Sequence, residues 1–199
     1  MERKRSIRSA RREERVRQVL ERRQPDLTVV IENVHDPHNV SAVLRTAEAV
    51  GIAQVQLIYT VEQFPKLGRK SSASARKWIE IRKFKSARDC CHALHEEGFT
   101  IFASRLDCEA RSLYDLDLVK KTALVFGNEH RGVSDEAAEC ADGIFYIPMM
   151  GMVQSLNISV ACAVALYEAY RQRSTSSAYA IPKFPSSVLE EMVRSWLKK

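Results

Sequence analysis

Between residues 27 and 173, short apolar runs rich in β-branched residues alternate with amphipathic stretches of helical period. The first run, LTVVIE at 27–32, has the composition of a buried strand. Further strands are predicted at 53–59, 77–84, 99–105, 122–127 and 143–148. Strands that alternate with helices are typical of an α/β domain with a mostly parallel sheet, and we therefore predict that fold class.

Polar residues at the ends of the apolar runs indicate where the intervening helices begin and end. Asn39 is expected to cap the helix VSAVLRTAEAV, and Ser134 is expected to cap a short helix later in the chain. A longer helix is predicted from about Leu156 to Arg173. The polar residues 60–76 are expected to form a long loop, and loops of that length inside a compact domain are often functional.

The excess positive charge lies at the amino end of the chain. Residues 1–24 hold ten Lys or Arg and four Glu, and the difference equals the whole formal net charge of +6. Such a concentration of cations predicts contact with a polyanion, most simply nucleic acid. The alternative is a solvated helix with Glu–Arg pairs, but the cations outnumber their possible partners. Because residues 3–23 have few apolar positions, we expect a lightly packed helix there, ended by Pro25.

The carboxyl end has a different pattern. Residues 174–185, STSSAYAIPKFP, have the composition of a linker. Apolar residues then recur at helical spacing, which predicts an amphipathic helix that packs on the main domain or on another subunit. These residues are Leu189, Met192, Val193, Trp196 and Leu197. The chain thus divides into a basic helical arm at 1–24, an α/β domain at 25–173, and a linker with a terminal helix at 174–199.

Several classes of protein lack their signatures here. No apolar run approaches the ~20 residues that span a bilayer, and no apolar signal segment follows the basic arm, so we expect a cytoplasmic protein. The five cysteines form no CxxC pair and are expected to be reduced, mostly buried thiols.

The motifs of several common enzymes are absent as well. GNEHRG at 127–132 has the glycine spacing of a P-loop, but Val133 stands where the lysine is required. No G-x-G-x-x-G fingerprint occurs, and Ser155 is not part of a G-x-S-x-G elbow. His92 and His95 share a predicted helix without a third ligand in register, so no metal site is predicted.

Three segments place polar residues directly after a predicted strand: ENVHDPHNVSAVLR, FGNEHRGVS and IPMMGMVQSLN. In a parallel sheet these ends lie on one edge, where ligands bind in open α/β folds. In the third segment, QSLN lies between two apolar runs, and burying such groups costs free energy unless they have partners. The polar side chains expected to converge are Asn33, Asn39, Arg45, Asn128, Glu129, Ser155 and Asn157. For Asn39 and Ser155, a capping role alone is the alternative.

These segments resemble the three sequence motifs of the SpoU (TrmH) branch of the SPOUT RNA methyltransferases. The motifs are NVHDPHNVSAVLRTAEAVG, LVFGNEHRGVS and IPMMGMVQSLNISVACAVALYEAYRQR, and they occur in the family's order and spacing. The resemblance extends from the basic arm to the terminal SWLKK. Within the branch, the sequence GMVQSLN and the short arm most resemble the members that methylate guanosine 18 in the D-loop of tRNA.

The resemblance implies a parallel-sheet α/β domain whose carboxyl segment forms a deep trefoil knot, and it implies a homodimer. It also implies transfer of a methyl group from S-adenosylmethionine to a ribose 2′-hydroxyl of tRNA, without a metal and with S-adenosylhomocysteine as product. The matched cofactor positions are Leu106, Gly127, Ile147 and Leu156. The matched catalytic arginine is Arg45, and the matched site-building residues are Asn39, Glu129, Ser155 and Asn157. Positions implicated in holding tRNA match Arg15, Arg23, Arg171 and Arg173.

Physical chemistry adds two expectations to this resemblance. A guanidinium is a poor base, so we expect Arg45 to act chiefly by stabilising charge on the ribose oxygen. We expect Glu129 to orient Asn39 or Arg45 rather than touch the substrate. Two alternatives stay open: the same transfer on ribosomal RNA or another tRNA position, and a non-catalytic RNA-binding protein of the same fold.

Overall fold

Seven parallel strands form one sheet in the described part of this computed structural model, which comprises residues 2–61, 63–65 and 75–199. The order across the sheet is β3-β2-β1-β6-β4-β7-β5, with every pair parallel. The strands are β1 (Leu27–Glu32), β2 (Gln54–Ile58), β3 (Glu80–Phe84), β4 (Thr100–Ser104), β5 (Arg111–Ser112), β6 (Thr122–Phe126) and β7 (Gly143–Tyr146). The predicted α/β class is confirmed. Much of the loop expected at 60–76 lies outside the described residues.

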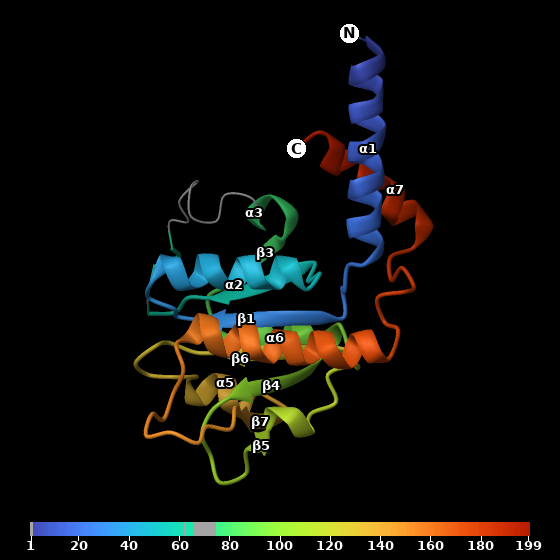
Figure 1. Ribbon diagram of the computed structural model, residues 1–199. Coiled ribbons are helices and arrows are strands. Elements are labelled where there is room, and N and C mark those ends of the chain that lie inside the picture. The colour runs from blue at the N-terminus through green and yellow to red at the C-terminus, as the bar shows by residue number, and fades with distance from the viewer. Residues whose placement is uncertain (1, 62, 66–74) are drawn as a thin grey trace.

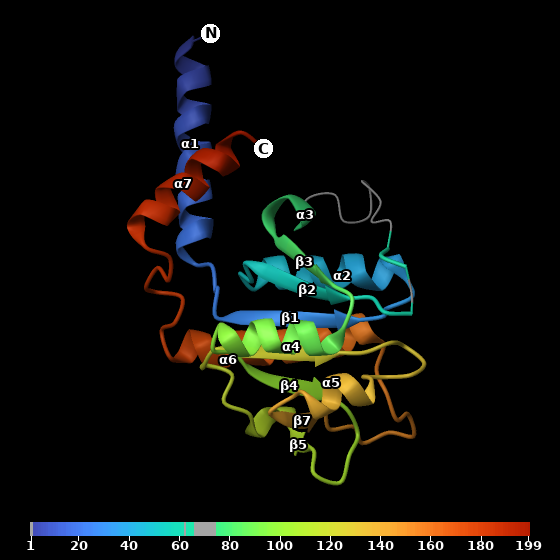
Figure 2. The ribbon, with the colours of Figure 1, turned by 180° about the vertical axis from the view of Figure 1, so that it is seen from behind.

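Helices cover both faces of this sheet. On one face lie α2 (Pro37–Ala49) and α6 (Ile158–Thr175), and on the other lie α4 (Ala87–Glu96) and α5 (Asp135–Glu139), as Figures 1 and 2 show from opposite sides. No helix in the described part of the chain combines the length and apolar character that a bilayer crossing requires.

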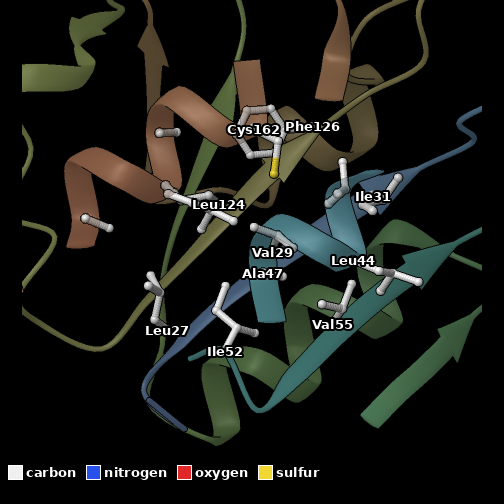
Figure 3. Packing of buried hydrophobic residues seen from close by; sticks show 14 of the residues in the cluster. Leu27, Val29, Ile31, Leu44, Ala47, Ile52, Val55, Leu124, Phe126 and Cys162 are labelled. Atoms are coloured by element: carbon white, nitrogen blue, oxygen red, sulfur yellow. The ribbon is translucent and has the colours of Figure 1, made fainter. Parts of the chain in front are cut away.

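The middle strand β1 is buried at every position. Val29 and Ile31 belong to the apolar cluster beneath α2 and α6, while Val30 belongs to the cluster beneath α4 and α5. This burial on both sides explains why the strand has an almost continuous apolar sequence. Figure 3 shows the first cluster, with Cys162 of α6 beside Phe126 of β6. Cys162 is free and fully buried, as expected, and burial raises the pKa of its thiol.

The predicted cap Asn39 was wrong, and so was the alternative that Ser155 is a cap; both corrections follow from neighbouring residues. Asp36, not Asn39, caps α2, because Pro37 fits the first helical turn and Asp36 Oδ1 accepts a hydrogen bond from the His38 N–H at 2.8 Å. Asn157, not Ser155, caps α6 by accepting from the Ser159 N–H at 2.9 Å. Asn39 and Ser155 are thereby left for other contacts. Ser134 does cap α5, as predicted.

The arm and the terminal helix pack on each other. The arm is α1 (Glu2–Glu21), which projects away from the sheet, and α7 (Ser186–Leu197) crosses it (Figure 1). Val16 and Leu20 of α1 form an apolar cluster with α7. The Trp196 ring lies 4.7 Å from that of Trp78 in α3 (Ala75–Trp78), so the amphipathic terminal helix also contacts the main domain, as predicted. Trp78 was expected in a strand, but β3 begins two residues later.

Arg173 near the end of α6 is fully buried, and all five of its N–H groups are used inside the protein. It donates to the Asp26 carboxylate at 2.6 Å and to Gln24 Oε1 at 3.0 Å. It also donates to the carbonyl oxygens of Leu118 at 2.8 Å and Lys120 at 2.7 Å. Its predicted contact with tRNA is therefore corrected: in this structure Arg173 holds three protein segments together.

Arg23 is the second corrected arginine, with only 1% of its surface exposed. It donates to the Ile52 carbonyl oxygen at 2.5 Å and to Glu48 at 3.2 Å, and its guanidinium lies 5.1 Å from the centre of the Trp196 ring. Arg23 therefore joins the arm to the domain and to α7. The sequence of the arm contains no signal that distinguishes a buried structural arginine from an arginine that contacts RNA.

Asp26 connects the expected linker to the same buried cluster. Lys183 donates to its carboxylate, so residues 174–185 are held against the domain rather than free. Burial alone would raise the pKa of Asp26, but the hydrogen bonds and charges of Lys183 and Arg173 outweigh burial and lower it below its usual value.

Candidate active site

The loop after β6 is closed by a pair of backbone hydrogen bonds. The Asn128 N–H donates to the Gly132 carbonyl at 2.9 Å, and the Gly132 N–H donates back at 2.8 Å. A side chain at Gly127 would place its Cβ only 2.0 Å from the Gly132 carbonyl oxygen. Only glycine fits at position 127 of this loop. The family resemblance matched Gly127 to the cofactor site, and this steric requirement is the physical reason for a glycine there.

Asn128 fixes this loop to the end of β1. Its buried side chain donates to the Asn33 carbonyl at 2.6 Å, and its Oδ1 accepts from the His130 N–H at 2.9 Å. Asn33 in turn has a positive φ of 50°, and its Oδ1 accepts from the Thr60 N–H at 2.9 Å. The two asparagines were expected near the site, and the structure shows that they shape the loops rather than point at a ligand.

Glu32, the last residue of β1, has a role that the sequence analysis missed. It is 3% exposed, and its carboxylate accepts from both the N–H and the hydroxyl of Ser134, at 2.9 Å and 2.6 Å. This contact sets the position of α5 and of the far end of the β6 loop. The sequence signal that pointed to this role was an acidic residue at the end of an otherwise apolar strand.

Three of the predicted site residues form a single hydrogen-bonded chain. Asn39 Nδ2 donates to Glu129 Oε1 at 2.9 Å, and Asn157 Nδ2 donates to Asn39 Oδ1 at 3.2 Å. Glu129 also accepts from the backbone N–H groups of His35 at 3.1 Å and Asp36 at 3.4 Å. The structure therefore brings together one residue from each of the three motifs.

The environment keeps Glu129 ionised. Its partial burial alone would raise the pKa of the carboxyl group, but the hydrogen bonds from Asn39 and from backbone N–H groups outweigh burial and lower the pKa below its usual value. A charged acceptor fixes the orientation of the Asn39 amide, because only the NH₂ end can face a carboxylate. The expectation that Glu129 orients Asn39 agrees with this geometry.

The segment from Gln154 to Asn157 lies at the surface. Gln154, Ser155 and Asn157 are exposed, and Leu156 is half-buried. The premise that these polar groups are buried between two apolar elements is therefore wrong, because the chain turns outward between β7 and α6. In Figure 1 this segment and the β6 loop lie at the same end of the sheet, where the carboxyl ends of the strands point.

Two adjoining hollows open at this end of the sheet. The first, of about 430 Å³, is lined by Leu106, Ile147 and Leu156 among others. The second, of about 470 Å³, is lined by Gly127 and Glu129. Leu156 and Ser155 line both. All four matched cofactor positions thus border these hollows, whose volumes lie within the ~300–1,000 Å³ typical of small-molecule sites.

Arg45 stands apart from the Asn39–Glu129–Asn157 chain. It follows Asn39 by six residues on α2, about 9 Å along the helix axis at ~1.5 Å per residue. Its side chain is exposed, and it forms no hydrogen bond or ion pair with the described residues. The structure thus leaves this guanidinium available to a ligand that reaches α2 from outside.

The remaining matched arginines are exposed. Arg15 lies on the solvent face of α1, and Arg171 is paired with Glu168 at 2.7 Å while 66% of its side chain stays exposed. His92 and His95 are at the surface, and no group of three potential metal ligands occurs among the described residues. The arrangement can orient polar groups of a ligand and place a cation near it.

Comparison with known proteins agrees with the motifs. The model of the SpoU rRNA Methylase family matches residues 26–167. A relative from Thermus thermophilus named tRNA (guanosine(18)-2′-O)-methyltransferase is 44% identical over 188 residues, which cover 94% of this chain and 96% of the relative. A relative of the same name from Escherichia coli is 40% identical over 165 residues, 83% of this chain and 72% of the relative. The crystal structure of the Aquifex aeolicus TrmH/SpoU tRNA modifying enzyme superposes with a TM-score of 0.89 at 37% identity, covering 96% of each chain.

Proposed function

Because the chain belongs to the SpoU methylase family, we propose that it methylates the ribose 2′-hydroxyl of guanosine 18 in the D-loop of tRNA, with S-adenosylmethionine as the methyl donor. The similarity to the Thermus thermophilus relative carries this proposal, because it covers almost the full length of both chains. Ribosomal RNA and other tRNA positions are the alternatives that the experiment below distinguishes. The proposed substrate is in keeping with a cytoplasmic enzyme.

The two adjoining hollows suit the proposed cofactor. Leu106, Ile147 and Leu156 offer apolar side chains, and the tight turn at Gly127 exposes backbone where a side chain cannot fit. Adenosine and methionine moieties would be held there largely by backbone groups. When bound, S-adenosylmethionine supplies a methyl group that is already activated on a sulfonium, so this transfer needs no metal.

The polar residues would position the ribose. Glu129 holds the Asn39 amide, and Asn39 holds the Asn157 amide, so the rim of the second hollow is fixed before a substrate arrives. Ser155 is exposed and lines both hollows, and it would contact the ribose hydroxyl. Orientation of this kind lowers the barrier because the entropy of alignment is lost on binding rather than in the reaction.

Arg45 would stabilise the negative charge that develops on the ribose oxygen or on the adjacent phosphate. Its planar, permanently charged fork suits an oxyanion and is a poor proton acceptor. Arg45→Lys and Arg45→Ala should therefore both lower kcat without changing cofactor affinity in calorimetry. An Arg45→Lys enzyme that retains near-full activity across pH would contradict this role, since lysine cannot reproduce the fork.

We also propose the trefoil knot and the homodimer that the family resemblance implies. For the dimer, Val160 and Tyr167 are seven residues apart on the outer face of α6 and are 47% and 53% exposed. Apolar side chains gathered in this way favour a subunit interface.

The decisive experiment is methylation of total tRNA with labelled S-adenosylmethionine, followed by mapping of the labelled nucleotide. The proposal expects label on the 2′-oxygen of guanosine 18 alone. Label at another tRNA position, or on ribosomal RNA in a parallel reaction, would identify that nucleotide as the substrate instead of guanosine 18. An absence of both turnover and cofactor binding in calorimetry would favour a non-catalytic RNA-binding protein.

A further inference from the structure

The helix α1 has two unlike faces. Val16 and Leu20 pack against α7, whereas Arg11 and Arg15 of α1 are exposed, as is Arg22 in the turn that follows the helix. Arg11 and Arg15 are four residues apart and share one face of the helix, and Arg22, which lines the same hollow as Arg15, continues this basic stripe beyond the helix end. None of them forms an ion pair or hydrogen bond with the residues that the structure describes, so the stripe is a row of uncompensated cations.

The stripe ends in a hollow of about 680 Å³ that is separate from the candidate active site. Arg15 and Arg22 line it on one side, and Tyr170 of α6 and Tyr179 line it on another. Gly51 lies in its wall, where a positive φ of 86° and the nearby Arg22 carbonyl, 2.9 Å from where a Cβ would lie, favour glycine. The hollow is at the amino edge of the sheet. In Figure 1 this is the end at which α1 joins β1, opposite the catalytic loops.

Two tyrosines give this hollow an aromatic wall. The Tyr179 hydroxyl donates to the Val50 carbonyl at 2.8 Å, which fixes the ring, and burial raises the pKa of Tyr179 to about 12. The Tyr170 ring lies 5.3 Å from that of Tyr179 and 5.9 Å from that of Tyr167. Tyr170 is nevertheless 43% exposed, so it is supported from behind and presents part of its ring to solvent.

The charge inside the hollow is positive. Glu48 is the one carboxylate among the described residues that line it, and its Oε1 already accepts a hydrogen bond from Arg23 at 3.2 Å. Arg15 and Arg22 remain for an anion. A stacking surface beside two unpaired guanidinium groups matches a nucleotide, which offers a flat base and a phosphate. An acidic peptide would satisfy the arginines but would leave the tyrosine wall without a matching group.

We propose that this hollow is a second RNA-binding site, which takes an unpaired nucleotide of the tRNA with its base on Tyr170 and its phosphates at Arg15 and Arg22. β1 separates the hollow from the active site by about 20 Å, at ~3.3 Å per residue over its six residues. The bound nucleotide is therefore not the one that enters the active site of the same chain. This inference rests on the proposed function for the identity of the RNA, but not for the presence of the site.

The test is tRNA affinity without cofactor, measured by fluorescence anisotropy on the full chain. Tyr170→Ala should weaken binding about tenfold, the loss typical of one base–aromatic stack, while Tyr170→Phe should bind like the wild type. Arg15→Ala and Arg22→Ala should each reduce the slope of log Kd against log salt by about 0.7–0.9. Arg17→Ala is the matched control on the same helix: Arg17 is paired with Glu190, and the slope should not change.

Three results would overturn the site. One is a Tyr170→Ala protein whose affinity for tRNA is within twofold of the wild type. Another is a Tyr170→Phe protein that loses as much affinity as Tyr170→Ala, since the ring is then not the binding element. The third is a change in molecular mass of Tyr170→Ala in light scattering, which would assign the hollow to a second copy of the chain. If instead tRNA binds but is not methylated, the proposed function fails while this site stands.

Discussion

Replacing Arg173 with methionine should destabilise the protein strongly without removing any exposed positive charge. The substitution keeps the length and apolar stem of the side chain but removes five donors from a fully buried position. The Asp26 carboxylate and the carbonyl oxygens of Leu118 and Lys120 would each lose a hydrogen bond. Lys183 would remain as the cationic partner of Asp26.

The size of the effect follows from the burial of the Arg173–Asp26 pair. Removing one partner of a buried ion pair costs about 3–5 kcal/mol. Here the cost falls on the acceptors of Gln24, Leu118 and Lys120, which lose their donor, because Asp26 is 26% exposed and keeps Lys183. A chain of 199 residues has an unfolding entropy near 0.4 kcal/mol/K at ~2.1 cal/mol/K per residue. The melting temperature of Arg173→Met should therefore fall by about 7–12 °C.

Thermal unfolding followed by circular dichroism measures this effect, with urea unfolding as the second method. Arg171→Ala is the matched control, because Arg171 lies two residues away and 66% of its side chain is exposed. Its partner Glu168 is only 7% exposed but keeps the hydrogen bond from Gln172 at 2.8 Å, so this variant should lose about 1–2 kcal/mol and its melting temperature should fall by about 2–5 °C, less than for Arg173→Met. Both variants should be measured without RNA.

The reasoning would be refuted if Arg173→Met melted like the wild type and lost affinity only for tRNA. That outcome would return Arg173 to the role that the sequence motif suggested. A large fall in melting temperature for Arg171→Ala would be equally damaging, since it would show that burial does not separate the two arginines.

Three further predictions concern the loops and the amino edge. Gly127→Ala should weaken cofactor binding in calorimetry by more than about tenfold, because its Cβ would meet the Gly132 carbonyl at 2.0 Å, whereas Gly151→Ala, with nothing within 4 Å, should bind normally. Glu129→Gln should lower both kcat and the melting temperature, the latter by about 2–5 °C for 1–2 kcal/mol, since one oxygen that accepts hydrogen bonds becomes a donor; an unchanged melting temperature with no turnover would contradict a positioning role. Because the pKa of Asp26 is lowered in the folded state, its contribution to stability is present above its unfolded pKa and is lost as pH falls through the lower, folded value. The melting temperature should thus drop more steeply below about pH 4 in the wild type than in Asp26→Asn, and parallel curves would exclude this carboxylate as a cause.

The sheet could be predicted because its strands follow a local rule. Strands such as β1 are apolar on both faces, and that pattern is visible in any short window of the sequence. The two residues of β5, Arg111 and Ser112, carry no such pattern, and the strand was missed. The caps of α2 and α6 were misplaced for a related reason: several polar residues stand side by side, and backbone geometry chooses among them.

The site could be predicted only in part, because its framework rests on contacts between distant residues. Asn128 reaches the Asn33 carbonyl 95 residues away, and Glu32 reaches Ser134 across 102 residues. The hydrophobic periodicity of the sequence does not reveal contacts between residues so far apart in the chain. The motif resemblance matched Asn39, Glu129 and Asn157, and the structure adds that they touch. Whether Arg45 meets the substrate stays a prediction.

The chain linking Glu129, Asn39 and Asn157 also determines when an active site can exist during synthesis. Asn39 leaves the ribosome early, but its amide can make both of its hydrogen bonds only after Glu129, and then Asn157, have been synthesised. The arginines of the arm emerge before any of these three residues. A chain arrested before residue 157 would thus carry the positive arm without the assembled rim, and under the proposed function we expect such a chain to bind RNA without modifying it.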